Sequence, residues 1–162
     1  MLTTQSELRA APQPAALRAW TGLLRAHAAS TRLLSASLQA DHGLTINDYE
    51  ALLLLSRAEG GRMRRVDLAQ QLLLTASGVT RLLDGLERAG LVVKATCASD
   101  LRVTYAQLTA AGRAKLEAAS CGHVRDLRAL FEGRLEEAEL ETLAQLLLKL
   151  HGAGAPGESC AP

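Results

Sequence analysis

The sequence predicts a mostly α-helical protein with one small β-hairpin. Two counts favour helices: of 162 residues, 33 are Leu and 29 are Ala, whereas only 6 are Val and 1 is Ile. The third observation is the position of the valines, because Val92, Val93 and Val103 fall within one short stretch. A chain of this length is sufficient for one compact domain.

The first predicted element is a long amphipathic helix from Pro14 to about Ala40. Residues 1–13 are polar and contain proline, so we expect them to be loose. Proline can occupy the first turn of a helix, and Gly43 can end this one. Apolar side chains recur within the helix at spacings of three and four, at Leu17, Trp20, Leu23, Leu24, Ala28, Leu34 and Leu38.

Three shorter helices are predicted next. Thr45 can cap the first, which ends before a Gly-Gly pair, and the second runs from Arg65 to about Leu73. Thr75 can cap the third, which ends at Gly90. The residues expected to face inward are, in chain order, Ile46, Tyr49, Leu52, Leu53 and Ser56, then Val66, Leu68, Ala69 and Leu72, then Val79, Leu82, Leu83 and Leu86.

A β-hairpin is predicted between residues 91 and 108. The runs LVVKAT and VTYAQL contain residue types typical of strands, and the polar segment CASDLR between them places the turn near Ser99–Leu101. Thr109 can then cap a helix that runs to about Phe131. The segment EEAELETLAQLLLKL predicts a final helix whose apolar stripe comprises Leu140, Leu143, Leu146, Leu147 and Leu150.

This order of a helix, a short helix, a tight turn, a helix and a β-hairpin is typical of a winged helix-turn-helix. In such a unit the second helix of the pair lies in the major groove, where base edges can be distinguished. The hairpin reaches the DNA backbone or the minor groove. Opposite its leucines, the helix after Thr75 has small, polar and basic residues. The residues of this face that we expect to contact DNA are Thr75, Ser77, Gly78, Thr80 and Arg81.

The charge of the chain is nearly balanced but unevenly distributed. The formal net charge is +1, from 18 Lys and Arg against 17 Asp and Glu. Residues 60–107 hold seven basic and four acidic residues, so this segment carries +3 and the remainder carries −2. The basic excess favours a nucleic-acid partner for the predicted helix-turn-helix. Arg62, Arg64 and Arg65 are expected to form a basic loop cluster that contacts phosphate.

Several strings resemble the multiple antibiotic resistance regulator (MarR) family. They are GLTINDYEALLLL, DLAQQLLLTASGVTRLLDGLERAGLV, and the D-x-R turn at Asp100–Arg102 that leads into YAQLTAAG. The resemblance covers residues 44–112 closely, whereas the flanking helices match the family's dimerisation helices in pattern only. It implies a mostly α homodimeric transcription regulator with a small β-hairpin wing.

The resemblance also implies which residues contact DNA. Arg102 in the wing would reach the DNA, and Asp100 would brace its guanidinium. Lys94 stands where an arginine is usual and is expected to contact DNA as well. Leu101 breaks the more frequent D-R-R sequence, and Gly85 replaces a frequent basic residue, so each removes a possible phosphate contact.

The predicted domain organisation places the DNA-binding unit between two dimerisation segments. Residues 14–151 form one domain, in which 44–108 are the winged helix-turn-helix and 14–43 and 109–151 are dimerisation helices; residues 1–13 and 152–162 are loose ends. The apolar faces of the N- and C-terminal helices have little core within the single chain to pack against. A second copy of the chain is therefore expected to bury them. A homodimer would place two recognition helices about one DNA turn apart on a pseudo-palindromic operator. We expect a repressor.

Other residues keep two interpretations. Trp20 and His27 lie seven positions apart and could line a cleft for a small-molecule effector, as the resemblance implies. Alternatively, Trp20 belongs to the core or a dimer interface, and His27 makes a polar contact within the protein. Cys97 lies in the predicted wing close to Lys94, which could lower its thiol pKa and make the regulator redox-responsive; otherwise it is passive. The predicted winged helix-turn-helix could also serve as an adaptor that binds protein partners instead of DNA.

Three of the residues expected at the DNA interface have structural alternatives. Arg81 could pair with Asp84 three residues on. Asp100 and Arg102 could simply stabilise their turn.

Other function classes find little support in the sequence. The three cysteines, at positions 97, 121 and 160, match neither a disulfide framework nor a zinc pattern, and Cys121 is expected to be packed on its helix. No catalytic pair or phosphate-binding glycine loop is convincing, so we expect no enzyme activity, cofactor or metal. No secretory signal and no apolar run of about 18 to 20 residues is present, which favours a cytoplasmic protein without a membrane partner.

Overall fold

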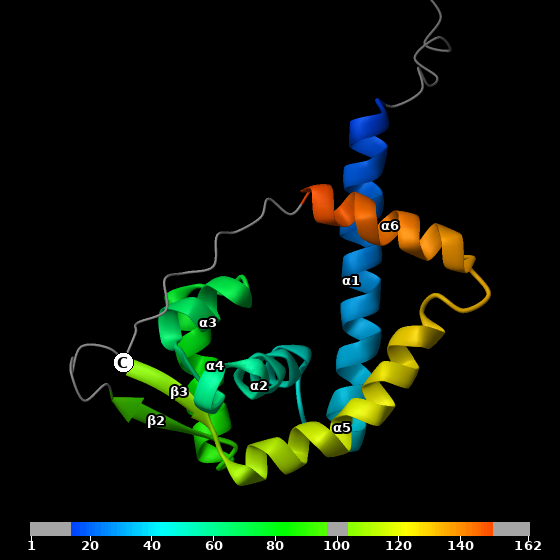
Figure 1. Cartoon of the computed structure of the whole chain (residues 1–162). Helices are drawn as coiled ribbons and strands as arrows, with labels where there is room; N and C mark the ends of the chain where they lie inside the picture. The colour runs from blue at the N-terminus through cyan, green and yellow to red at the C-terminus, as the bar shows by residue number, and fades with distance from the viewer. Residues whose placement is uncertain (1–13, 97–103, 151–162) are drawn as a thin grey trace, which may run out of the picture. The chain divides into compact units, whose positions relative to one another are not determined.

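A computed structural model describes residues 14–96 and 104–150, and it confirms the mostly α-helical fold with a small wing (Figure 1). The described residues divide into two compact units, with the boundary inside the first helix after Leu33. The elements, in chain order, are α1 (Ala15–His42), α2 (Ile46–Arg57), a 3-10 turn (Glu59–Gly61), β1 (Arg62–Arg64), α3 (Arg65–Gln71), α4 (Ala76–Arg88), β2 (Val92–Thr96), β3 (Thr104–Leu108), α5 (Ala110–Ala129) and α6 (Glu137–Leu150).

Threonines begin three of these helices, as the sequence predicts. Thr45 forms a capping box with Asp48: its Oγ1 accepts from the Asp48 amide at 3.2 Å, and its own amide donates to the Asp48 carboxylate at 2.9 Å. Thr75 and Thr109 cap α4 and α5 by accepting from amides three residues on, at 3.1 and 2.9 Å. These bonds satisfy amides that the first turn of a helix leaves unpaired.

The core joins α2, α3, α4 and the sheet. Its fully buried large side chains are Leu52, Leu55, Leu68 and Val92. On α4, Val79, Leu83 and Leu86 are buried as expected. On α2 the buried face is Tyr49, Ala51, Leu52 and Leu55, whereas Leu53 and Ser56 are only half-buried.

The inward orientation expected for Val66 is wrong. Its side chain is 68% exposed, while Leu68, Ala69 and Leu72 are buried. Two residues along a helix correspond to a rotation of about 200°. Val66 therefore lies on the opposite side of α3 from Leu68.

The sheet has three antiparallel strands in the order β1-β3-β2, not two. The hairpin pairs Val92 with Leu108 and Thr96 with Thr104, and it projects away from α5 (Figure 1). The strand Arg62–Arg64 pairs with the other edge of β3. The interpretation of these arginines as a loop is therefore wrong, because a three-residue strand with a distant pairing partner has no periodicity to detect. The hairpin turn lies outside the described residues.

The start of α5 packs closely against the Gly90–Leu91 turn, which leads into β2. The Thr109 amide donates to the carbonyl of Leu91 at 3.1 Å, and the Thr109 hydroxyl lies 2.8 Å from the carbonyl of Gly90. A Cβ atom on Gly112 would lie 2.1 Å from the Leu91 carbonyl oxygen. Only glycine allows this approach of the helix.

The later helices are largely exposed in the single chain. No residue of α6 is buried, and Leu143, Leu146, Leu147 and Leu150 are between 36% and 74% exposed. The packed position expected for Cys121 is wrong, because this residue is exposed on α5. Among the described helices, none combines the length and the apolar character that a membrane crossing requires.

Candidate nucleic-acid interface

The helix α4 is amphipathic, with one face in the core and the other exposed. Ser77 and Arg81 are exposed and lie four residues apart, so they share one side of the helix. The Ser77 hydroxyl lies 3.1 Å from the capping hydroxyl of Thr75. A Cβ atom on Gly78 would lie 3.2 Å from that same Thr75 hydroxyl, so a larger residue would crowd the cap. The first turn of α4 thus presents a compact polar surface.

The structure does not show the alternative pairing of Arg81 with Asp84. Within residues 14–96 and 104–150, Arg81 has no ion pair. Asp84 pairs instead with Lys94 of β2, at 3.3 Å, and the same ammonium lies 2.9 Å from Glu87. The hydrogen bond to Glu87, followed by that to Asp84, raises the pKa of Lys94. Arg81 is thus available to a ligand, whereas Lys94 ties the wing to α4.

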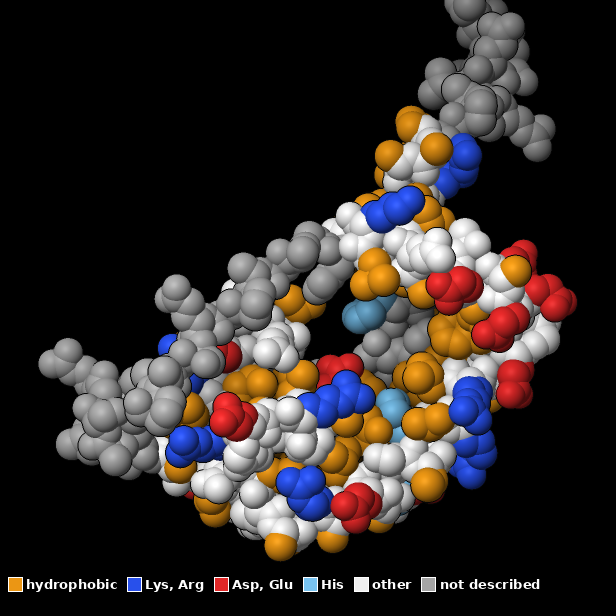
Figure 2. Space-filling model, in the orientation of Figure 1, with side chains coloured by type: hydrophobic (Ala, Val, Ile, Leu, Met, Phe, Trp, Pro, Cys, Tyr) orange, Lys and Arg blue, Asp and Glu red, His pale blue; other side chains and the backbone are white. Residues whose placement is uncertain are grey.

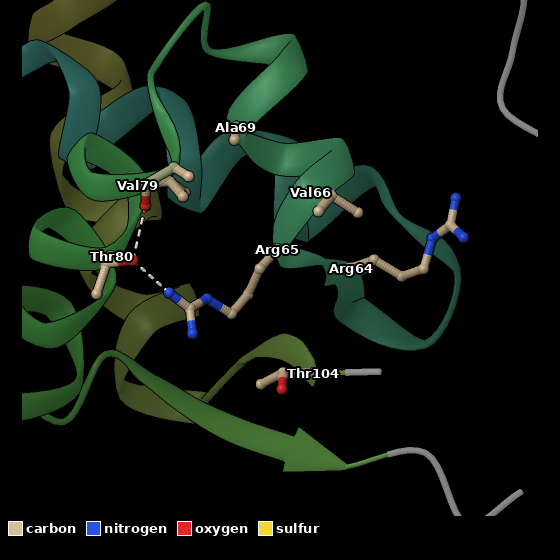
Figure 3. A pocket seen from close by; sticks show the side chains of 8 residues that line it. Arg64, Arg65, Val66, Ala69, Val79, Thr80 and Thr104 are labelled. Atoms are coloured by element: carbon tan, nitrogen blue, oxygen red, sulfur yellow. Dashed lines mark hydrogen bonds between the residues drawn. The ribbon is translucent and has the colours of Figure 1, made fainter. Parts of the chain in front are cut away.

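A cavity of about 420 Å³ lies between α3, α4 and β3. Figure 3 shows Arg65 extending from α3 across this cavity toward Thr80, while Arg64 points away from it. The guanidinium of Arg65 donates to the Thr80 hydroxyl at 2.5 Å. Arg64 instead donates two hydrogen bonds, at 2.6 and 2.9 Å, to the carboxylate of Asp67. The two neighbouring arginines therefore have different surroundings.

Two of the expected wing contacts, Asp100 and Arg102, lie outside the described residues. The candidate redox residue Cys97 lies outside them as well. The contact expected from Lys94 and the redox role expected of Cys97 stay predictions.

A polar cluster between α1, α2 and α5 was not predicted from the sequence. The hydroxyl of Ser37 donates to the carboxylate of Asp126, and the Tyr49 hydroxyl lies 3.3 Å from that of Ser120. The ring of His123 packs 4.3 Å from that of Tyr49. The two hydrogen-bonded pairs join residues 89 and 71 positions apart, so no local pattern could reveal them.

The electrostatics of this cluster follow from burial and hydrogen bonding. His123 Nδ1 is buried and has no hydrogen-bond partner among the described residues. Burial lowers the pKa of His123, and the nearby Asp126 carboxylate partly opposes this effect. The hydrogen bond from Ser37 lowers the pKa of Asp126, and Arg125 acts in the same direction. The neutral imidazole is thus the form that fits the fold.

Trp20 and His27 are both exposed on α1. Trp20 is 58% exposed, so the interpretation of this residue as part of the core is wrong. Its assignment to an effector site or a dimer contact stays a prediction.

Comparison with known proteins identifies the family. A family model described as "MarR family" matches residues 42–102. AbsC, a MarR family transcriptional regulator from Streptomyces coelicolor, is 32% identical and superposes with a TM-score of 0.76 over 93% of this chain and 95% of AbsC. The chain belongs to the MarR family. Its winged helix-turn-helix and the sequence-based family assignment are thereby confirmed.

Two further relatives are informative. A second MarR family regulator from Streptomyces coelicolor, solved in complex with DNA, has a TM-score of 0.80 and 26% identity over 95% of this chain and 98% of that one. The transcriptional repressor YetL from Bacillus subtilis is 34% identical over 98 residues, which are 60% of this chain and 59% of YetL. This chain is thus a MarR family transcriptional regulator.

Proposed function

We propose that this MarR family member is a sequence-specific repressor that binds double-stranded DNA as a homodimer. The observation that carries the proposal is the exposed face of α4, on which Arg81 has no ion pair among the described residues. An exposed guanidinium on a groove-sized helix can donate two hydrogen bonds to a guanine edge. The related regulator solved with DNA and the repressor YetL support this direction.

The proposed interface combines the recognition helix with the wing. Ser77 and Arg81 would face the major groove, with Thr75, Gly78 and Thr80 on the same turns. The wing would contribute Lys94, Arg102 and its brace Asp100, and the start of α3 would contribute Arg64 and Arg65. The backbone amides in the first turn of α4 can also donate hydrogen bonds to phosphate.

The charge distribution supports this orientation. Figure 2 shows acidic side chains gathered over the connection between α5 and α6. The exposed glutamates there are Glu132, Glu136, Glu137, Glu139 and Glu141. Such a surface repels a polyanion, whereas the segment 60–107 carries a net charge of +3. DNA would therefore approach the α3–α4–wing side.

The proposed dimer would bury apolar surface that the single chain leaves exposed. Leucines of α6 are up to 74% exposed, and Trp20 is 58% exposed on α1. A second copy can cover both by two-fold symmetry. Two recognition helices would then meet half-sites about one DNA turn apart. A small-molecule effector could release the DNA only if its affinity differed between the bound and the free form of the dimer.

The test is DNA binding by the full chain. Labelled duplexes that tile the region upstream of its own coding sequence are titrated with protein, beside a scrambled duplex of equal length. We expect the protein to bind one of the upstream duplexes at least about a thousandfold more tightly than the scrambled duplex. Equal affinity for all duplexes, or no salt-dependent binding, would contradict it; the second result is the one expected of a protein-binding adaptor.

A further inference from the structure

The difference between Arg64 and Arg65 assigns them different roles. Arg64 forms a two-point pair with Asp67, with its Nε 2.6 Å from one carboxylate oxygen and its Nη2 2.9 Å from the other. This two-point pairing offsets the positive charge of the Arg64 guanidinium locally. The two residues are adjacent in sequence, but they point in different directions (Figure 3).

Arg65 has a neutral partner instead. Its Nη2 donates to the hydroxyl of Thr80, and among the described residues it has no ion pair. A guanidinium has five N–H donors, so most of those of Arg65 remain available. The side chain lies in the cavity between α3, α4 and β3, which Thr104 of β3 also lines (Figure 3). The described structure thus holds an uncompensated positive charge beside the recognition helix.

The hydroxyl of Thr80 is fully committed within the protein. It donates its one hydrogen to the carbonyl of Ala76 at 2.7 Å and accepts from Arg65 at 2.5 Å. It therefore has no hydrogen left to donate to a base. Its expected role as a hydrogen-bonding base reader does not follow from this geometry, whereas a role in holding Arg65 does.

We propose that Arg65 contacts a backbone phosphate of the bound DNA and that Thr80 is the residue that positions its guanidinium. This inference rests on the proposed DNA-binding function. Arg65 begins α3, the first helix of the helix-turn-helix pair, and in such pairs the first helix crosses the DNA backbone. An arginine at this position meets phosphate oxygens, which lie along the groove edge on every sequence.

A double-mutant cycle tests the proposal. The affinities of wild type, Arg65→Gln, Thr80→Val and the double variant are measured on the tightest-binding duplex over a series of salt concentrations. Loss of the phosphate contact should weaken binding about tenfold for each copy of the chain. The slope of log affinity against log salt should fall by about 0.9 per copy. Thr80→Val should reduce affinity in the wild-type background and have no further effect in the Arg65→Gln background.

A control with an equal change of charge separates this contact from general loss of basic groups. Arg57→Gln removes one positive charge from the exposed end of α2, outside the proposed interface, and its salt slope should equal that of wild type. Thermal unfolding of each variant verifies that it folds.

Three results would overturn the inference while wild type still binds DNA. They are an unchanged salt slope in Arg65→Gln, additive effects of the two substitutions, and a loss confined to duplexes with one particular base pair. The last would make Arg65 a base reader. Absence of salt-dependent binding by wild type would instead overturn the proposed function itself.

Discussion

Replacing Gly112 by alanine should destabilise the fold through one identifiable contact. The added Cβ would lie 2.1 Å from the carbonyl oxygen of Leu91 and 2.7 Å from Cδ1 of Leu108. The leucine side chain can move, but the carbonyl belongs to the backbone and also accepts the Thr109 amide at 3.1 Å. Relief of the clash must therefore shift the first turn of α5 away from the Gly90–Leu91 turn.

The magnitude follows from three contributions. Overpacking against backbone costs about 3 kcal/mol, and weakening the Thr109 cap costs about 1 kcal/mol. The higher helix propensity of alanine relative to glycine stabilises the folded state by about 1 kcal/mol. The net loss of about 3 kcal/mol corresponds to a decrease of about 6 to 12 °C in Tm for a chain of this size.

Gly122→Ala is the matched control in the same helix. A Cβ there meets only the end of the flexible Arg125 side chain, at 3.9 Å, which is an ordinary contact. This variant gains the same methyl group and the same helix propensity, so its Tm should rise by about 2 to 4 °C. Thermal unfolding followed by circular dichroism at one protein concentration measures both variants. A Gly112→Ala protein as stable as wild type would refute the close packing of α5 on the backbone of Leu91.

Two further predictions concern pH and assembly. Because burial holds the pKa of His123 below 6.5 in the folded state, stability should decrease as pH falls from 6.5 toward that lower value. His123→Phe keeps the ring against Tyr49 and should flatten this dependence in urea unfolding; an unchanged pH profile would show that His123 does not contribute. On α6, Leu147→Glu should raise the dimer dissociation constant more than about tenfold in sedimentation experiments, since dimerisation would bury the charge. Gln145→Glu, on the polar side of the same helix, should leave assembly unchanged, and equal effects of the two would argue against a leucine interface.

Much of the fold could be predicted because its determinants are local. The leucine spacing and the capping threonines Thr45, Thr75 and Thr109 place the helices to within two residues of their observed ends. A cap requires only that a side-chain hydroxyl accept a hydrogen bond from the backbone amide three residues later. Both groups lie within one short segment, so the sequence alone identifies them. Val92 and Val93 likewise mark the strand β2, because β-branched residues favour extended backbone.

What could not be predicted depends on packing between distant segments. The partner of Arg65 is Thr80, 15 positions away, and nothing in the sequence distinguishes Arg65 from Arg64. Asp126 meets Ser37 only after α1 and α5 have packed together. The outward orientation of Val66 follows from the rotation of a short helix, which one turn of periodicity does not determine.

DNA binding by α4 through the face that carries Arg81 can be tested by one pair of variants. The affinity of Arg81→Gln for the tightest-binding duplex is compared with that of Arg57→Gln, which removes an equal charge from the exposed end of α2. We expect Arg81→Gln to weaken binding by about tenfold or more for each copy of the chain and Arg57→Gln to bind like wild type. Equal affinities for wild type and Arg81→Gln, with the fold intact, would contradict it.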